Sequence, residues 1–142
     1  MDLNYHRPGN CSGYGMTRIL LVEDSKDILF LLQTELEWMD YTVDVAADAL
    51  TGLELARRNR PSVIVSDLQM PDIDGCEFIR RVRKIQELNP VPAIALTGYS
   101  LGKEVQLALA AGFDAHLTKP VDGKTISDMI GRLLTKCLKK AS

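Results

Sequence analysis

Apolar stretches alternate along this chain with segments in which apolar residues recur every three or four positions. The first pattern is typical of buried β-strands and the second of amphipathic α-helices. Five strands are predicted on this basis, at residues 18–22, 42–46, 62–66, 93–96 and 115–118. Because helical segments separate the strands, the sequence predicts a doubly wound α/β domain, in which a parallel sheet of five strands carries helices on both faces.

Five helices follow from the same spacing, and three of them precede the fourth strand. The first is predicted at about residues 25–39, with an apolar face made of Ile28, Leu32, Leu36 and Met39. The second is expected at about residues 48–59, where Pro61 terminates it. The third begins after Gly75 and ends before Asn89, and its buried residues are expected to be Phe78, Val82 and Ile85.

The last two helices flank the fifth strand. The fourth, at about residues 101–111, is rich in alanine and ends at Gly112, a normal place for a left-handed residue after a helix. The fifth has Thr125 and Asp128 near its start and shows the strongest pattern of all. Its apolar residues recur at spacings of three and four: Ile126, Met129, Ile130, Leu133, Leu134, Cys137 and Leu138.

The composition fits a single globular domain of 142 residues. Residues 1–16 lack any period, so we expect a flexible N-terminal extension there and one domain over residues 17–140. A net charge of −2 gives no electrostatic footprint for nucleic acid, and no apolar run approaches the ~20 residues that span a bilayer. The three cysteines are odd in number and lack metal-ligand spacing, which favours reduced thiols in a cytoplasmic protein.

Four of the predicted strands stop on polar residues. Glu23 and Asp24 follow the first strand, Asp67 the third, Thr97 the fourth and Lys119 the fifth. The carboxyl ends of parallel strands meet at one edge of the sheet, where α/β proteins place their sites. We therefore expect three carboxylates, a hydroxyl and an ammonium to converge there. Such a set suits a divalent cation and a phosphoryl group.

Asp67 is the candidate nucleophile, because a carboxylate can attack a phosphoryl group and form an acyl phosphate. The neighbouring Glu23 and Asp24 would repel the phosphoryl oxygens, and a bound Mg²⁺ would relieve that repulsion. Lys119 adds a flexible positive charge that can reach Asp67 or the phosphoryl group. A simpler interpretation exists for each residue: a solvated loop pair or helix cap for the two acids, a surface lysine, and in Thr97 a β-branched residue favoured in strands.

Four motifs stand in order at these strand ends: Leu21-Val22-Glu23-Asp24, Asp67-Leu68-Gln69-Met70-Pro71 with Gly75, Leu96-Thr97-Gly98 and Lys119-Pro120-Val121. Taken together, they make the chain similar to a receiver domain, the phosphorylatable module of two-component response regulators. The resemblance extends from about Thr17 to Lys139. It implies the flavodoxin-like strand order 2-1-3-4-5.

The resemblance also implies how the site is built. Asp67 would be the phosphoacceptor, and Asp24 and Asp67 would bind Mg²⁺ directly. Glu23 would act largely through water, and the backbone carbonyl of Gln69 would supply a further oxygen. In the family the peptide bond between the lysine and the following proline is cis, which aims Lys119 inward.

A conformational switch is implied as well. In the family the threonine, here Thr97, moves toward the phosphoryl group, and an aromatic residue on the fifth strand turns inward behind it. His116 holds that position, where Tyr or Phe is more usual, and it is smaller and more polar than either. An alternative is that His116 is an edge-strand residue with no role. The surface of the fourth helix, fifth strand and fifth helix would be the one that changes.

By resemblance, then, the chain is a phosphoacceptor in a His–Asp phosphorelay. Its donor would be a sensor histidine kinase or a histidine-phosphotransfer protein, and its target an unknown downstream protein. It would be a signalling switch whose only activity is slow self-dephosphorylation, with no direct contact to nucleic acid or membrane. It would act alone or be the receiver of a larger protein such as a hybrid kinase.

Two other classes share parts of this pattern. A haloacid-dehalogenase-type phosphatase also uses an aspartate nucleophile after a strand, but it needs a second Asp two positions on as general acid. Gln69 occupies that position and cannot protonate a leaving group. A flavodoxin-like flavin binder would need a phosphate-cradling loop after its first strand, where Glu23 and Asp24 would repel the phosphate. The site, not the fold, separates these classes.

Overall fold

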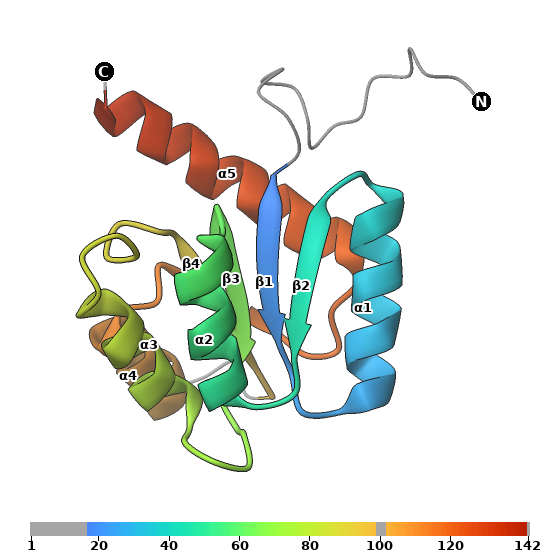
Figure 1. The fold of residues 1–142 in the computed structure, drawn as a ribbon, viewed down its shortest axis with the longest axis horizontal. Helices are drawn as coiled ribbons and strands as arrows, with labels where there is room; N and C mark the ends of the chain where they lie inside the picture. The colour runs from blue at the N-terminus through green and yellow to red at the C-terminus, as the bar shows by residue number, and fades with distance from the viewer. Residues whose placement is uncertain (1–16, 99–101, 142) are drawn as a thin grey trace.

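Among the residues that the structure describes, five parallel strands form one sheet, in the order β2-β1-β3-β4-β5 (Figure 1). The computed structural model describes residues 17–98 and 102–141, with the backbone alone from residue 136 onward. The strands are β1 (Arg18–Val22), β2 (Thr42–Ala46), β3 (Val63–Asp67), β4 (Ala93–Thr97) and β5 (Ala115–Thr118). The predicted fold class and strand order are confirmed. The proposed extension at residues 1–16 lies outside the described residues.

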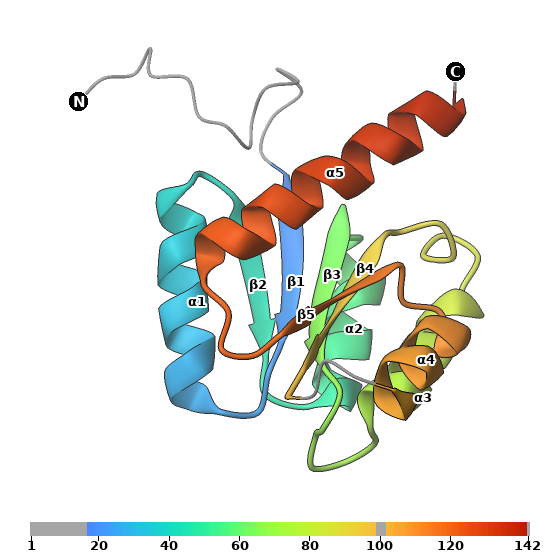
Figure 2. The same ribbon diagram turned by 180° about the vertical axis from the view of Figure 1, so that it is seen from behind.

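The helices cover both faces of this sheet, as predicted. They are α1 (Lys26–Trp38), α2 (Ala49–Asn59), α3 (Gly75–Arg83), α4 (Lys103–Ala111) and α5 (Gly123–Ala141). Figures 1 and 2 show α1 and α5 on one face and α2, α3 and α4 on the other. The predicted start of the fourth helix at Leu101 falls outside the described residues.

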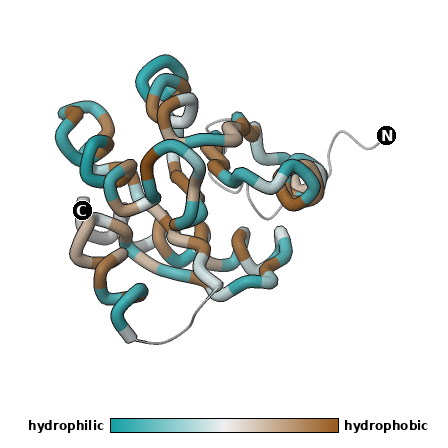
Figure 3. Tube along the Cα trace, turned by 90° about the horizontal axis from the view of Figure 1, so that it is seen from below, coloured by the Kyte–Doolittle hydropathy of each residue, from teal (hydrophilic) through white to brown (hydrophobic). Residues whose placement is uncertain are grey.

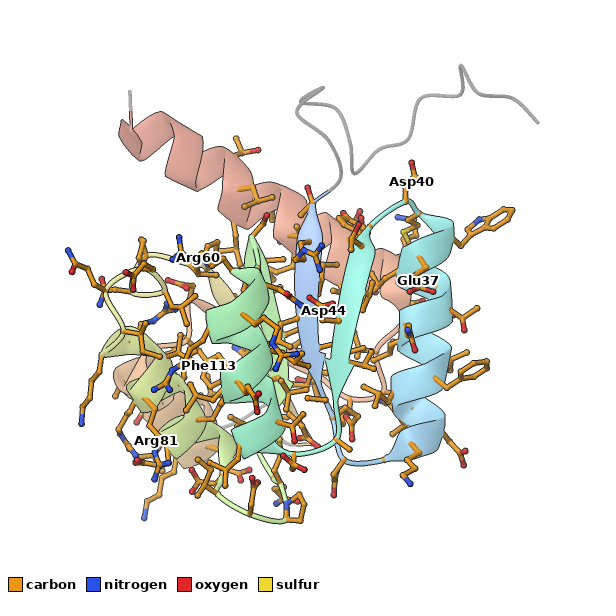
Figure 4. All side chains as sticks on the ribbon, in the orientation of Figure 1. Glu37, Asp40, Asp44, Arg60, Arg81 and Phe113 are labelled. Atoms are coloured by element: carbon orange, nitrogen blue, oxygen red, sulfur yellow. The ribbon has the colours of Figure 1, made fainter. Side chains whose placement is uncertain are left out.

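Each face of the sheet has its own hydrophobic core. Under α2, α3 and α4 the buried cluster includes Leu20, Ile64, Phe78, Ala108 and Phe113, the last labelled in Figure 4. Under α1 and α5 it includes Ile19, Leu32, Val65, Ile94 and Ile126. Seen from the carboxyl edge of the sheet in Figure 3, hydrophobic and hydrophilic segments alternate around the helices, as amphipathic packing requires. These two cores hold the strand ends in fixed positions.

Two helices differ from their prediction. Leu32 and Leu36 of α1 are buried as predicted and Met39, directly after the helix, is partly buried, whereas Ile28 is 37% exposed and its neighbour Leu29 is buried in its place. The predicted third helix is too long: α3 ends at Arg83, and Ile85 lies in the hydrogen-bonded turns that follow it. Of the residues expected to be buried there, Phe78 and Val82 are, and Ile85 is only partly so.

Side-chain oxygens cap the first turn of several helices. Ser25, Asp48 and Asp74 cap α1, α2 and α3, and Asp122 accepts a hydrogen bond from the Thr125 amide in the first turn of α5. Capping of α5 therefore comes from a residue before the predicted Thr125 and Asp128. Within the part of the chain that the structure describes, no helix is both long and apolar enough to cross a membrane.

Candidate functional site

The carboxyl edge of the sheet collects the polar residues that the sequence placed at the strand ends. Asp67 is the last residue of β3 and pairs in register with Leu96, and Thr97 ends β4 and pairs with Thr118. Lys119 follows β5 directly, and its amide donates a hydrogen bond to the Thr97 carbonyl (2.7 Å). The parallel register therefore brings together side chains that are far apart in the sequence, as predicted.

Three carboxylates form a cluster that could hold a metal ion. One oxygen from each of Glu23, Asp24 and Asp67 lies within 4.8 Å of the others. Glu23 and Asp67 are buried, whereas Asp24 is exposed and faces solvent. Hard carboxylate oxygens with one open side are the donors that Mg²⁺ prefers, because it keeps several of its waters. The residues present therefore fit this ion.

Lys119 supplies the positive charge beside this cluster. Its Nζ lies 2.9 Å from Asp67 Oδ2, within hydrogen-bond distance, and 3.1 Å from Glu23 Oε1. The second contact is an ion pair only, since Oε1 is buried and, among the described residues, accepts no hydrogen bond with adequate geometry. The Lys119–Pro120 peptide bond is cis, as the resemblance implied. One lysine thus bridges two of the three acids.

The ionisation of this group reflects crowding. Burial raises the pKa of Glu23 above its ordinary value, and the negative charge of Asp67 raises it further. The hydrogen bond from the Ser25 amide and the pairing with Lys119 lower this pKa, but they do not cancel the rise. Burial lowers the pKa of Lys119, but the hydrogen bond and charge of Asp67, together with Glu23, outweigh it, so this pKa is raised. Lys119 therefore stays charged, and its positive charge only partly offsets the cost of burying an ionised Glu23.

The loop between β3 and α3 is fixed against the Asp67 backbone. A Cβ at Gly75 would lie 2.5 Å from the Asp67 carbonyl oxygen, so only glycine fits there. The Gln69 amide donates to Asp67 Oδ1 at 3.4 Å. The Asp72 carboxylate accepts hydrogen bonds from the amides of Ala49 and Leu50 at the start of α2. Burial acts to raise the pKa of Asp72, but these hydrogen bonds outweigh it and the pKa is lowered. This contact of Asp72, which joins two distant segments, was not predicted from the sequence.

A pocket of about 320 Å³ opens beside Asp67. Its walls are formed by Asp67, Leu68, Gln69, Thr97, Gly98, Glu104 and Lys119. Glu104, in the first turn of α4, was not predicted. A signal existed in the sequence, since Glu104 precedes the buried Ala108 by four residues and so lies on the inward line of the helix. The pocket is large enough for a phosphoryl group and water.

His116 does not line this pocket. It is half-buried on β5, where it pairs in register with Ala95, two residues before the Thr97–Thr118 pair. Since paired residues and every second residue of a strand share a face, His116 and Thr97 lie on the same side of the sheet. The placement expected for a coupled pair is thus present.

The chain belongs to the family of response regulator receiver domains. Its sequence matches the model described as response regulator receiver domain over residues 19–131. It is 45% identical over 104 residues to a protein from Leptolyngbya boryana known as an uncharacterized 14.6 kDa protein in the sodA1 3′ region, covering 73% of this chain and 79% of that one. Several other relatives are transcriptional regulators, and the chain spans about half of their length.

Solved structures agree with the family. The chemotaxis protein CheY4 of Vibrio cholerae is similar to this chain with a TM-score of 0.80 and 31% identity, over 83% of this chain and 98% of that one. The receiver domain of the sensor histidine kinase PA1611 of Pseudomonas aeruginosa has a TM-score of 0.77 and 30% identity, over 83% and 97%. That structure holds a magnesium ion in its active site cleft.

Proposed function

We propose that Asp67 of this receiver domain accepts a phosphoryl group and thereby switches the surface of α4, β5 and α5 for a partner protein. The observation that supports this best is the position of Asp67: its carboxylate is paired with Lys119 at 2.9 Å and forms a wall of the 320 Å³ pocket. The second acid that a phosphatase of the dehalogenase type needs is absent, because Gln69 stands two positions on.

In the transfer, a carboxylate oxygen of Asp67 attacks phosphorus and forms the new P–O bond. The bond from phosphorus to the donor histidine breaks, and the imidazole nitrogen retains the electron pair and gains a proton. Lys119 follows the developing charge, since its ammonium can turn from Asp67 to a phosphoryl oxygen. Thr97 and Gly98 line the same pocket, and the Thr97 hydroxyl would bond another phosphoryl oxygen.

The cluster of acids would hold Mg²⁺. Asp24 and Asp67 would bind it directly, with the Gln69 carbonyl, and Glu23 would act through water. When bound, the ion neutralises the carboxylates and the phosphoryl oxygens. The buried Glu23 Oε1, which pairs with Lys119 at 3.1 Å but accepts no hydrogen bond of adequate geometry among the described residues, keeps acceptor capacity at this place. Magnesium in the corresponding cleft of the similar PA1611 receiver domain supports the same assignment.

The donor would be a sensor histidine kinase or a histidine-phosphotransfer protein, and the phosphoryl group would leave by slow hydrolysis. The downstream partner would read α4, β5 and α5, where Leu107 and Leu109 are exposed on α4. A cytoplasmic location fits the thiol of Cys76, which forms no disulfide.

The direct test is phosphorylation by a small acyl phosphate in the presence of Mg²⁺, followed by intact-mass measurement. The wild type should gain one phosphoryl group that hydroxylamine removes, because an acyl phosphate is labile to that nucleophile. Asp67→Asn should gain none, since the amide is a poor nucleophile. Asp128→Asn, which removes an exposed carboxylate on α5, is the matched control and should label normally. Undiminished labelling of Asp67→Asn would contradict the site.

A further inference from the structure

Glu104 is a carboxylate on the inward line of α4. It stands four residues before Ala108, the one residue of that helix that is fully buried, and it is half-buried itself. Its side chain forms part of the pocket wall together with Asp67, Thr97 and Lys119. A charged residue on the inward face of a helix needs a polar environment, and the pocket provides it. The space beside the phosphoacceptor is therefore negative on the side of α4.

The amino-terminal end of α4, which carries Glu104, lacks the side-chain cap that the first three helices have. Gly102 caps this helix without a side-chain hydrogen bond, whereas Ser25, Asp48 and Asp74 each cap theirs. The opposite end is fastened, because the Arg83 guanidinium donates two hydrogen bonds to the carbonyl of Gly112, directly after the helix, at 3.0 and 2.7 Å. Among the described residues, α4 is thus fastened by side-chain hydrogen bonds just after its carboxyl end, whereas no side chain caps the end that faces the pocket.

We propose that Glu104 is the group through which α4 senses phosphorylation, an inference that rests on the proposed role of Asp67. A phosphoryl group brings about −1.5 to −2 charges at neutral pH. Placed on Asp67, it enters the 320 Å³ pocket that Glu104 also lines, and the two negative charges repel each other across that pocket. The amino-terminal turn of α4 moves outward in response, pivoting about the fastened end at Gly112.

This route is separate from the one through Thr97 and His116. It needs no rotation of a strand residue, only an interaction that differs between the two positions of α4, which any ligand-driven shift requires. Linkage makes it reciprocal: if the phosphoryl group displaces Glu104, then Glu104 weakens binding at Asp67 by the same free energy. Removing its charge therefore has two effects of opposite sign, tighter binding and a smaller movement.

The experiment uses the full chain with Mg²⁺ and beryllofluoride, which mimics the phosphoryl group on Asp67, followed by amide NMR. Glu104→Gln keeps the shape of the side chain and removes its charge. It should bind beryllofluoride about fivefold more tightly than the wild type and lose at least half of the shifts induced in residues 102–111. The gain in affinity should shrink as salt is raised, since the repulsion is partly screened.

Glu87→Gln is the matched control, because Glu87 is an exposed carboxylate in the connection between α3 and β4 and lies outside the pocket. It should match the wild type in both affinity and shifts. Equal affinity of Glu104→Gln and the wild type would overturn the inference, and so would full shifts in residues 102–111 of Glu104→Gln. If the wild type binds no more beryllofluoride than Asp67→Asn does, the proposed function itself fails and the role of Glu104 falls with it.

Discussion

Two helices of equal length adjoin the phosphoacceptor site and are secured in very different ways: α3 follows the loop after Asp67, and α4 carries Glu104 of the pocket wall. α3 and α4 each span nine residues. α3 has a capping aspartate at its start, Gly75 pressed against the Asp67 backbone, and three large side chains fully buried, namely Phe78, Ile79 and Val82. α4 has an uncapped glycine and buries only Ala108 completely.

This contrast separates two tasks. A nucleophile must be held in place, and α3 fixes the backbone of Asp67 and the loop that carries Gln69. A readout element must be able to move at low cost, and α4 has little buried surface to lose when it shifts. Arg83, at the end of α3, joins the two by binding the Gly112 carbonyl, so the fixed helix provides the pivot for the other.

The largest expected effect breaks the packing of α3. Phe78→Ala should cost about 3–5 kcal/mol of unfolding free energy, because a fully buried aromatic side chain leaves a cavity. Leu107→Ala on α4 should change it by no more than about 0.5 kcal/mol, since that side chain is 56% exposed. Urea denaturation of the two variants measures both values. Similar losses would mean that α4 is packed as firmly as α3.

A matched pair of glycines sharpens the comparison. Gly75→Ala should cost about 1–3 kcal/mol, because the new Cβ would meet the Asp67 carbonyl and the backbone of Leu68. It should also slow phosphorylation, since Asp67 itself is displaced. In Gly98→Ala, beside the pocket on the α4 side, the new Cβ meets no atom of the described residues within 4 Å, and the variant should stay within about 0.5 kcal/mol of the wild type. Melting curves and the labelling assay together decide this, and equal tolerance at both positions would refute the fixed role of α3.

The strands and their polar ends could be predicted because both are local features. Apolar runs identify strands, and parallel topology then places Asp67, Thr97 and Lys119 at one edge. The burial of Leu29 in place of Ile28 could not be predicted, because the two residues are similarly apolar and only packing decides which faces inward. The contacts of Asp72 and Arg83 could not be predicted either, since each side chain binds backbone groups that are far away in the sequence.

Magnesium should stabilise the α3 side more than the α4 side. With a dissociation constant on the order of 1 mM, 10 mM Mg²⁺ would add about 1.4 kcal/mol to the stability of the fold. Hydrogen exchange should slow in the loop at residues 68–74, which carries Gln69, and hardly change in α4. Asp24→Asn should lose most of this response, whereas Asp27→Asn, an exposed carboxylate outside the cluster, should keep it. An unchanged melting temperature in the wild type would exclude the metal.

A smaller effect concerns the stability that the folded protein loses by burying the ionised carboxylate of Glu23. Because the pKa of Glu23 is raised in the fold, the folded state holds its proton more tightly, and stability falls as the pH rises through the interval above the ordinary value of 4.5. Glu23→Gln should therefore be more stable than the wild type at pH 7 without metal, and the difference should vanish below pH 4.5. Thermal melts across that range in the presence of a chelator test the sign. A variant less stable at pH 7 would show that the pair with Lys119 dominates.

The smallest expected effect lies on the mobile side and leaves stability almost unchanged. His116 shares a sheet face with Thr97 and would fill the space left when that threonine moves toward the phosphoryl group. His116→Ala should therefore still accept phosphoryl at Asp67 but show reduced beryllofluoride-induced amide shifts in β5 and α5. Thr97→Ala should behave likewise, whereas the first turn of α4 should respond in both, because Glu104 acts on it directly. Full wild-type shifts in β5 and α5 of His116→Ala would make His116 a strand residue only, and α4 would then carry the signal alone.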